Sequence, residues 1–238
     1  MSHPPRFLIS LATYNERENL PILTAQIFEF APQADILVVD DSSPDGTADW
    51  VEEQMKNGSR FKLIKRAGKL GLGTAILAAM EYAVQHDYDF LINMDADLSH
   101  PPRFLPALCA KAAEGFDVVI GSRYVSGGNI IGWAWHRRMM SQAINTYARC
   151  LLGLKTRDNS GSFRCYRTAL LKRLDQREIL SHGYSFFEEI LYRLRKLGAT
   201  FAEVPITFEE RRAGQSKLNL KEIVIALWLL LRIGLTKP

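Results

Sequence analysis

The chain has few cysteines, and none of them stands in a paired arrangement. Its 238 residues include three, Cys109, Cys150 and Cys165, with no Cys-x-x-Cys spacing. Neither a disulfide framework nor a zinc site is indicated. The first apolar run, residues 7–12, is too short for the core of an export signal. These absences lead us to expect a cytoplasmic protein.

Long apolar runs are also missing. Residues 223–231 are apolar throughout but lie between Glu222 and Arg232, whereas a membrane-spanning helix needs about 20 apolar residues. We expect residues 218–238 to form a C-terminal amphipathic or apolar helix. Such a helix can lie in a membrane interface, pack on its own fold or dock onto a membrane partner.

The basic residues are not arranged for binding nucleic acid. The net charge is +4, but no basic run is interleaved with aromatic residues, and no zinc-finger or RNA-recognition spacing is present. We therefore expect no nucleic-acid partner. The hydrophobic content of 47% is ample for a buried core and excludes a disordered or fibrous chain.

Short apolar runs alternate with helix-like segments, which predicts an α/β fold with a mostly parallel central sheet flanked by helices. We expect strands at residues 7–12, 35–40, 61–65, 90–94 and 118–121, and helices at 16–30, 47–56, 73–85 and 104–114. Further along we expect helices at 136–152 and 186–197, and strands at 162–167 and 201–208. Pro205 indicates an edge position or a bulge in the last strand. Residues 209–217 are too polar to pack and are expected to form a mobile loop.

Acidic residues follow two of the expected strands. Asp95 and Asp97 point to one side of an extended segment and can share a divalent cation that holds a diphosphate. Asp40 and Asp41 end another strand and can accept hydrogen bonds from a nucleoside. Helix capping and turn chemistry are the alternatives for both pairs. Because the carboxyl ends of parallel strands share one edge of a sheet, we expect the pairs to converge on one crevice.

Arginines gather later in the chain. Arg123 directly follows an apolar strand, where burial without an anionic partner would be costly. Arg137 and Ser141 are four residues apart on an expected helix and can reach the same phosphate. A solvated basic face is the alternative. Arg211 and Lys217 suit a loop that closes over anions, although a plain solvent loop fits them too.

Taken in order, these segments resemble glycosyltransferase family 2 with the GT-A fold, and more closely its polyprenyl (dolichyl) phosphate mannosyltransferases. The resemblance extends from about Leu8 to Lys217. It is carried by residues 14–16 (YNE), 39–47 (VDDSSPDGT), 69–73 (KLGLG), 94–101 (MDADLSHP), 121–124 (GSRY), 160–164 (SGSFR), 203–206 (EVPI) and the loop from Arg211 to Lys217.

The resemblance implies a Rossmann-like GT-A catalytic domain over residues 1–217, which the C-terminal helix expected over 218–238 follows. It implies a nucleotide-sugar site formed by Ala12, Tyr14, Glu16, Asp40, Asp41, Lys69, Gly71, Asp95, Ala96 and Asp97. It implies Mg²⁺ or Mn²⁺ on Asp95, Asp97 and Ser99, and an acceptor phosphate on Arg123, Arg137, Ser141, Arg211 and Lys217, with Asp97, Arg123 and Arg137 catalytic. Two positions depart from the family, since Ala12 often is proline there and Ser99 is glutamine in some members.

The activity implied is inverting transfer of mannose from GDP-mannose to a polyprenyl or dolichyl phosphate. The enzyme would work peripherally at the cytoplasmic face of a membrane, on its surface or on a small membrane-anchor subunit. A phosphate acceptor is largely ionised at neutral pH and needs no catalytic base. Glu188 and Glu189 are the candidates for a base, and we interpret them as structural.

Two other functions remain open. The same fold can transfer glucose or another sugar to polyprenyl phosphate or to a hydroxyl. Alternatively, the chain is a non-catalytic nucleotide-sugar-binding subunit of a membrane complex. The Gln-x-x-Arg-Trp signature of processive synthases is absent from the sequence, which counts against a polymerising enzyme.

Overall fold

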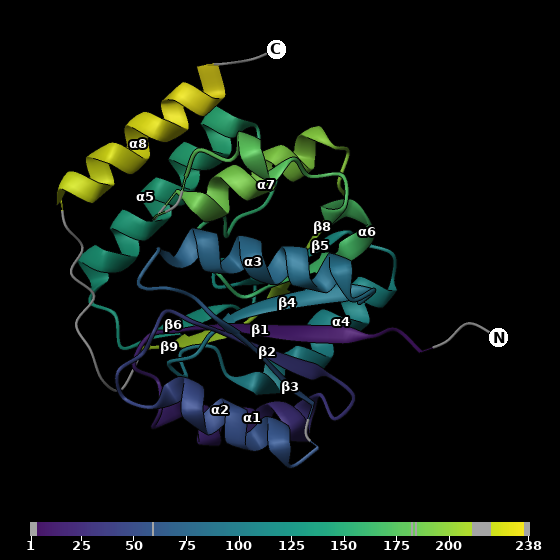
Figure 1. Ribbon diagram of the computed structural model, residues 1–238. Helices are drawn as coiled ribbons and strands as arrows, with labels where there is room; N and C mark the ends of the chain where they lie inside the picture. Colours follow the sequence, from purple (N-terminus) through teal and green to yellow (C-terminus); the bar gives the residue numbers. More distant parts are fainter. Residues whose placement is uncertain (1–3, 59, 182, 184, 211–219, 236–238) are drawn as a thin grey trace.

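A seven-stranded sheet forms the centre of the protein, in the order β3-β2-β1-β4-β7-β5-β8 (Figure 1). The computed structural model describes residues 4–58, 60–181, 183, 185–210 and 220–235. The strands are β1 (Phe7–Thr13), β2 (Asp35–Asp40), β3 (Phe61–Lys65), β4 (Phe90–Asp95), β5 (Val118–Ser122), β7 (Arg164–Arg167) and β8 (Phe201–Pro205). Only β7 runs antiparallel to its neighbours β4 and β5. The predicted mostly parallel sheet is confirmed.

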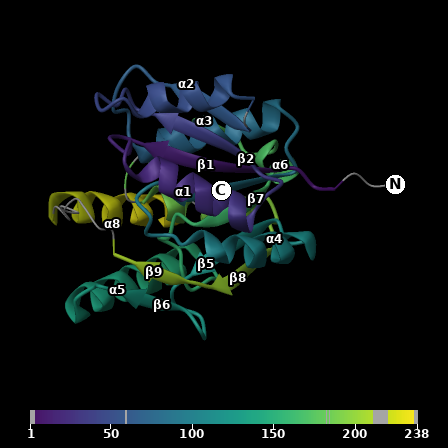
Figure 2. The same ribbon diagram turned by 90° about the horizontal axis from the view of Figure 1, so that it is seen from below.

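Helices cover both faces of this sheet, so the fold has three layers (Figures 1 and 2). They are α1 (Asn19–Phe30), α2 (Thr47–Lys56), α3 (Leu72–Gln85), α4 (Leu105–Ala113), α5 (Trp135–Leu152), α6 (Thr168–Leu171), α7 (Phe186–Lys196) and α8 (Leu220–Leu235), with short 3₁₀ turns at Pro102–Phe104 and Gln176–Glu178. One face packs against α1, α2 and α4, and the other against α3, α6 and α7.

Successive residues of the central strands enter opposite cores. Ile9 and Ile92 pack toward α1 and α4, whereas Leu8 and Leu91 pack toward α3 and α7. All four side chains are fully buried. A strand covered on both faces reads as a continuous apolar run, which explains why the sequence predicted these strands well.

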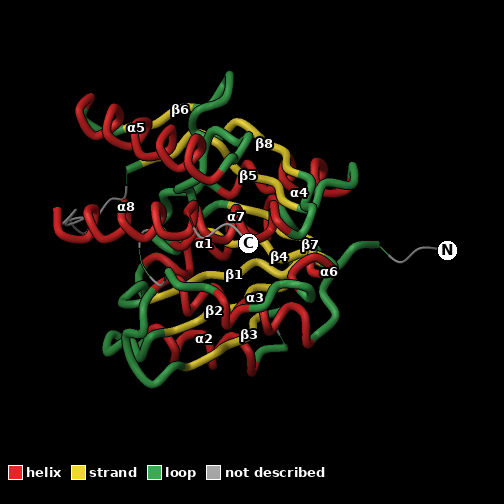
Figure 3. Tube along the Cα trace, turned by 90° about the horizontal axis from the view of Figure 1, so that it is seen from above, coloured by secondary structure: helices red, strands yellow, loops and turns green. Residues whose placement is uncertain are grey.

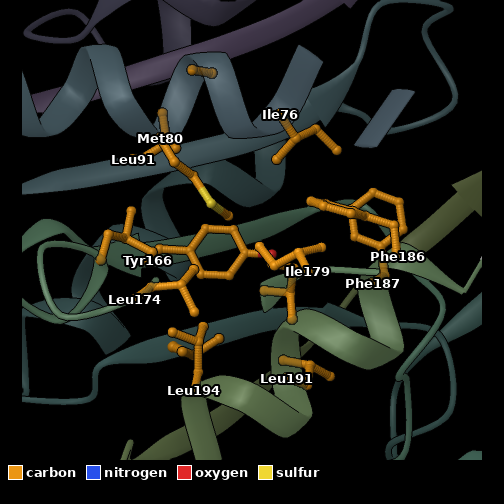
Figure 4. Close-up of a cluster of buried hydrophobic side chains, with 14 of the residues drawn as sticks. Ile76, Met80, Leu91, Tyr166, Leu174, Ile179, Phe186, Phe187, Leu191 and Leu194 are labelled. Carbon is orange, nitrogen blue, oxygen red and sulfur yellow. The ribbon is translucent and has the colours of Figure 1, made fainter. Parts of the chain in front are cut away.

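The core between the sheet and α7 contains large side chains from distant parts of the chain (Figure 4). Met80 of α3 and Leu91 of β4 lie over Tyr166 of β7, and Phe186 and Leu191 of α7 close the cluster. This packing holds the second half of the chain against the sheet formed mainly by the first half.

The expected strand over residues 201–208 is wrong in one respect. It divides at Ile206 into β8 and β9 (Thr207–Glu209), and β9 pairs with β6 (Asn129–Ile131) in a separate two-stranded sheet. Pro205 ends β8 at the edge of the main sheet, as predicted, because proline has no N–H for a further ladder bond. The division brings β9 toward the carboxyl ends of the central strands.

The C-terminal helix α8 lies beside α5 (Figure 3). The Tyr147 hydroxyl of α5 donates a 3.3 Å hydrogen bond to the carbonyl of Leu227, and Leu230 and Ile233 are buried. The expected mobile loop lies largely outside the described residues, at 211–217. Within the described ranges, no helix combines the length and the hydropathy needed to cross a bilayer. The domain boundary at residue 217 stays a prediction.

Glu188 in the first turn of α7 is buried, and its Oε2 has no hydrogen-bond partner among the described residues. Burial raises its pKa to about 7. The folded state therefore keeps a proton that the unfolded chain loses near pH 4.5. Stability is then lost as pH rises through this window, by on the order of 3 kcal/mol. We expect Glu188→Gln to gain stability relative to the parent between pH 4.5 and pH 8, as measured by urea unfolding.

The neighbouring Glu189→Gln is the control. Its carboxylate accepts hydrogen bonds from the backbone of Leu180 and Ser181 and from Arg193. This variant should be less stable than the parent and show no relative gain at high pH. Parallel stability profiles for Glu188→Gln and the parent would contradict the raised pKa.

Candidate active site

A cleft of about 850 Å³ opens at the carboxyl ends of β1, β4 and β5. Seven of the predicted site residues line it: Ala12, Glu16, Lys69, Asp95, Ala96, Asp97 and Arg123. They come from four separate segments of the sequence, at residues 12–16, 69, 95–97 and 123. The structure thus brings the acidic pair and the first arginine of the sequence-based prediction to one cavity.

The two carboxylates of the acidic pair are held by neighbouring hydroxyls. Asp95 ends β4, and its Oδ1 accepts a 2.7 Å hydrogen bond from Ser162. Asp97 Oδ1 accepts bonds from the backbone N–H and the hydroxyl of Ser99, at 3.1 and 2.5 Å. Leu98, between Asp97 and Ser99, adopts the left-handed conformation, with φ of 66°. The pair is therefore oriented by a tight turn and not by a helix cap.

The pair fits a divalent cation only together with ligand oxygens. Asp95 and Asp97 offer hard carboxylate oxygens, and Ser99 lies buried beside Asp97. In the described part of the chain, no three acidic, histidine or cysteine side chains group tightly enough to hold a metal. Mg²⁺ is commonly bound by one or two carboxylates plus substrate phosphates. The residues fit that arrangement.

The second acidic pair is engaged within the protein. Asp40 accepts hydrogen bonds from Thr13 and Ser43. Asp41 is paired with the buried guanidinium of Arg66 and accepts a 3.3 Å bond from the N–H of Leu70. Neither residue lines the cleft. Their contact with a nucleoside stays a prediction, and what the structure shows is that Asp41 and Arg66 shape the turn after β3.

Four more of the residues predicted to bind the nucleotide sugar lie at or near the opening of the cleft. Lys69 lies 4.4 Å above the ring of Tyr14, which is 41% exposed. Glu16 accepts a 2.6 Å bond from Asn19. Gly71 has φ of 96°, a conformation that favours glycine, and its carbonyl accepts a bond from Arg66. An exposed aromatic ring beside a lysine offers stacking and charge to a nucleotide.

Arg123 has the anionic partner that its burial requires. Its Nε and Nη2 donate to the two carboxylate oxygens of Asp158 at 2.7 and 2.6 Å, and its backbone N–H donates to Asp158 at 2.9 Å. Burial alone would raise the pKa of Asp158, but the guanidinium outweighs it and holds this pKa below its usual value. In the described structure the anion that meets Arg123 is thus Asp158. Its contact with an acceptor phosphate stays a prediction.

Aromatic rings surround the same guanidinium. The rings of Tyr124, Trp133 and Phe208 have their centroids 5.3 to 5.7 Å from it. Phe208 comes from β9, so the division of the expected strand completes this wall. Gly128 permits the turn that follows, because a Cβ there would lie 2.7 Å from the backbone of Arg123.

Among the other predicted acceptor residues, the described Arg137 and Ser141 do not line the cleft. Arg137 lies 4.1 Å from the ring centre of Trp133 and forms a 2.7 Å ion pair with Glu210. Ser141 accepts a 2.7 Å bond from the Tyr124 hydroxyl. Arg211 and Lys217 lie outside the described residues. Arg137 and Ser141 therefore stand behind the aromatic wall, one side chain away from Arg123.

A third part of the cleft is apolar. It is lined by Leu180, Phe187 of α7, and Ile225, Ala226 and Leu229 of α8. The cavity thus joins a carboxylate pair, a cationic and aromatic wall, and an aliphatic wall.

Sequence reasoning missed several residues that shape this site: Arg66, His100, Trp133, Asp158, Ser162 and Phe208. Asp158 had a usable signal, since a buried arginine requires a carboxylate partner. His100 and Ser162 stand in segments that carry the family resemblance, but no role was assigned to them. Nothing local singled out Arg66, Trp133 and Phe208, because they meet the site from separate elements.

The sequence profile of glycosyl transferase family 2 matches residues 9–175. The chain belongs to this family. As a member of family 2 it is a glycosyltransferase, and the predicted family and enzyme class are confirmed.

The polyprenol monophosphomannose synthase of Mycolicibacterium smegmatis is 41% identical over 229 residues, covering 94% of this chain and 86% of that protein. The undecaprenyl-phosphate mannosyltransferase of Micrococcus luteus is 41% identical over 214 residues, covering 90% and 88%.

Solved structures with the same fold include glucosyl-3-phosphoglycerate synthase from Mycobacterium tuberculosis, determined with Mn²⁺, uridine diphosphate and phosphoglyceric acid. It superposes with a TM-score of 0.68 at 18% identity, covering 98% of this family 2 chain and 80% of that one. At this identity the likeness establishes the GT-A fold alone.

Asp158→Asn tests the ion pair beneath the cleft. The variant leaves the buried Arg123 without a full counter-charge, and we expect the free energy of unfolding to fall by roughly 3 kcal/mol, measured by urea denaturation. Asp87→Asn is the control, because Asp87 is exposed and lies 3.6 Å from Lys172. Its unfolding midpoint should match the parent. Equal stability of both variants would show that Asp158 does not neutralise Arg123.

Proposed function

We propose that this glycosyltransferase transfers mannose from GDP-mannose to a polyprenyl or dolichyl phosphate, with inversion at the anomeric carbon. The observation that carries the proposal is the composition of the cleft. A carboxylate pair suited to a metal-bound diphosphate lies in the same cavity as an arginine and an aliphatic wall. The names of the two relatives at 41% identity support a mannosyl donor and a polyprenyl-phosphate acceptor.

The donor diphosphate belongs at the carboxyl end of β4. Asp95 and Asp97 would hold Mg²⁺ or Mn²⁺ there, with Ser99 beside them. When bound, the metal supplies charge neutralisation for the diphosphate leaving group. Lys69 and Tyr14 at the mouth would contact the nucleotide, and Asp40 and Asp41 would set the turns on which it rests.

The acceptor phosphate belongs beside Arg123. Two nitrogens of this guanidinium bind Asp158, while Nη1 makes no hydrogen bond to a described residue. A phosphate monoester carries about −1.5 to −2 charge at neutral pH, so the nucleophile is already ionised. No described carboxylate in the cleft has to act as its base. Arg123, with Arg137 and Ser141 behind it, would orient the nucleophile and offset its repulsion from the donor.

The donor and acceptor are tested in one matrix of transfer assays. Purified protein is incubated with GDP-mannose, UDP-glucose or UDP-N-acetylglucosamine and with a short polyprenyl phosphate or the matching polyprenol, each with and without Mn²⁺. We expect lipid product only from GDP-mannose, polyprenyl phosphate and metal together. Asp97→Ala should lower turnover by about 100-fold or more, because charge on the leaving group is no longer offset.

Each other result selects a rival. Product formed from UDP-glucose would show that the donor is UDP-glucose. Product formed on polyprenol would show that the acceptor is a hydroxyl. GDP-mannose binding without any product favours a non-catalytic subunit. Parent-like turnover in Asp97→Ala would remove the metal role of that residue.

We further propose that the exposed face of α8 and the start of α5 rests on the cytoplasmic surface of a membrane. Ile225, Trp228 and Leu235 are 53%, 59% and 71% exposed along α8, and Trp135 and Met139 are 73% and 60% exposed on α5. The two helices lie side by side (Figure 3). Ile225 also lines the cleft, so a lipid acceptor could enter from this surface.

Vesicle sedimentation tests the membrane face. We expect Ile225→Glu to weaken binding to phospholipid vesicles, since it places a charge in the apolar face. Ile22→Glu is the matched control, because Ile22 is 49% exposed on α1, and it should bind as the parent does. If the parent itself does not sediment with vesicles, a membrane-anchor subunit becomes the better account of this face.

A further inference from the structure

His100 is a buried side chain of the cleft for which the proposed reaction has no assigned role. It is 3% exposed and lines the cavity together with Asp95 and Asp97. Its ring stacks on Phe163 with centroids 5.2 Å apart and meets Phe208 edge-on at 5.4 Å. These two rings come from the segment before β7 and from β9. The imidazole is therefore fixed in position from both sides.

The hydrogen bonding of His100 determines its tautomer. The backbone N–H of Asp95 lies 3.1 Å from His100 Nδ1. A backbone N–H can only donate, so Nδ1 must offer a lone pair, and the proton of the neutral ring sits on Nε2. Asp95 Oδ2 is also 3.7 Å from Nδ1, but Nδ1 cannot donate to it while accepting at the shorter distance.

This contact closes the turn that carries the acidic pair. The turn runs from Asp95 to His100 and contains Leu98 at φ of 66°, a left-handed conformation that is strained for a residue with a side chain. Ser99 stabilises only the Asp97 side of the turn. On the Asp95 side, Ser162 holds the carboxylate and His100 holds the backbone.

The same turn is joined to the wall beside Arg123. The N–H of Glu209 in β9 donates a 3.1 Å bond to the carbonyl of Ser99, and Phe208 contacts both His100 and the guanidinium of Arg123. His100 thus lies between the carboxylates at the proposed donor site and the aromatic wall at the proposed acceptor site.

We propose that His100 is a positioning residue whose Nδ1 lone pair holds the backbone of Asp95, and thereby sets the carboxylate pair for a metal-bound nucleoside diphosphate. The proposal rests on the proposed donor site. Residues that orient metal ligands through hydrogen bonds typically contribute 10- to 100-fold to metal affinity.

Three substitutions distinguish the effect of the Nδ1 acceptor from the effect of the ring's shape and from that of Nε2. His100→Asn places an amide oxygen near the Nδ1 position and keeps the acceptor. His100→Gln places its amide near Nε2 and removes that acceptor. His100→Phe keeps the planar ring between Phe163 and Phe208 but has neither nitrogen. His86→Phe is the control, because His86 lies exposed at the end of α3.

The measurement is Mn²⁺ affinity by electron paramagnetic resonance in the presence of GDP, and separately of UDP, without acceptor or turnover. We expect His100→Phe and His100→Gln to bind Mn²⁺ with nucleotide at least tenfold more weakly than the parent. His100→Asn and His86→Phe should remain within about threefold. Thermal unfolding of each variant shows whether the fold is retained, and nitrogen-15 NMR of the parent should show the Nε2–H tautomer.

Each result decides the proposal. Parent-like affinity in a folded His100→Phe, an affinity of His100→Asn as weak as that of His100→Phe, or an Nδ1–H tautomer would overturn it. The proposal would also be overturned if the parent protein failed to bind Mn²⁺ in the presence of either GDP or UDP. If the parent binds Mn²⁺ with UDP but not with GDP, the proposed donor is wrong, while the same ordering of variants with UDP still supports the role of His100.

Discussion

The ion pair between Arg123 and Asp158 is the interaction on which the arrangement of this site depends. A guanidinium that follows a buried strand must find a carboxylate, because an unpaired charge there would cost several kcal/mol. Asp158 also accepts the backbone N–H groups of Arg123 and Gly161. The pair therefore ties the end of β5 to the segment before β7, and it does so directly beneath the cleft.

The elements around the cleft follow from this tie. Gly161 and Ser162 belong to the segment that Asp158 holds, and Ser162 reaches across to the carboxylate of Asp95. On the other side, Phe208 and Trp133 pack around the Arg123 guanidinium. One buried charge pair thus links the metal-binding carboxylates proposed at β4 with the aromatic wall proposed for the acceptor.

Two charged residues around this site are paired within the protein. Asp41 is paired with Arg66, and Arg137 with Glu210. A buried cation without a carboxylate partner would be costly. The ion pairs of Arg66, Arg123 and Arg137 fix the positions of these side chains, while Nη1 of Arg123 makes no hydrogen bond to a described residue and remains available to a ligand.

Much of the fold was predictable because its cause is local. Strands such as β2 and β4 are apolar runs of strand length, and the helices α2 and α3 between them each follow a turn glycine, Gly46 or Gly71. The carboxyl ends of the parallel strands indicated the crevice, and the resemblance of ordered motifs indicated the family. The prediction of one strand over residues 201–208 was wrong because both halves show the same alternation of apolar and polar residues. They are separated only by their pairing in different sheets.

By itself, the sequence determined that parallel strands would end at one edge and that the acidic pair after β4 would lie there. Only the tertiary structure decided which side chains meet these groups. Arg123 finds Asp158 35 residues further along the chain, and β9 supplies Phe208 to the ring of His100 from more than a hundred residues away. Such contacts depend on how segments distant in the sequence pack together, and a local sequence pattern does not indicate that packing.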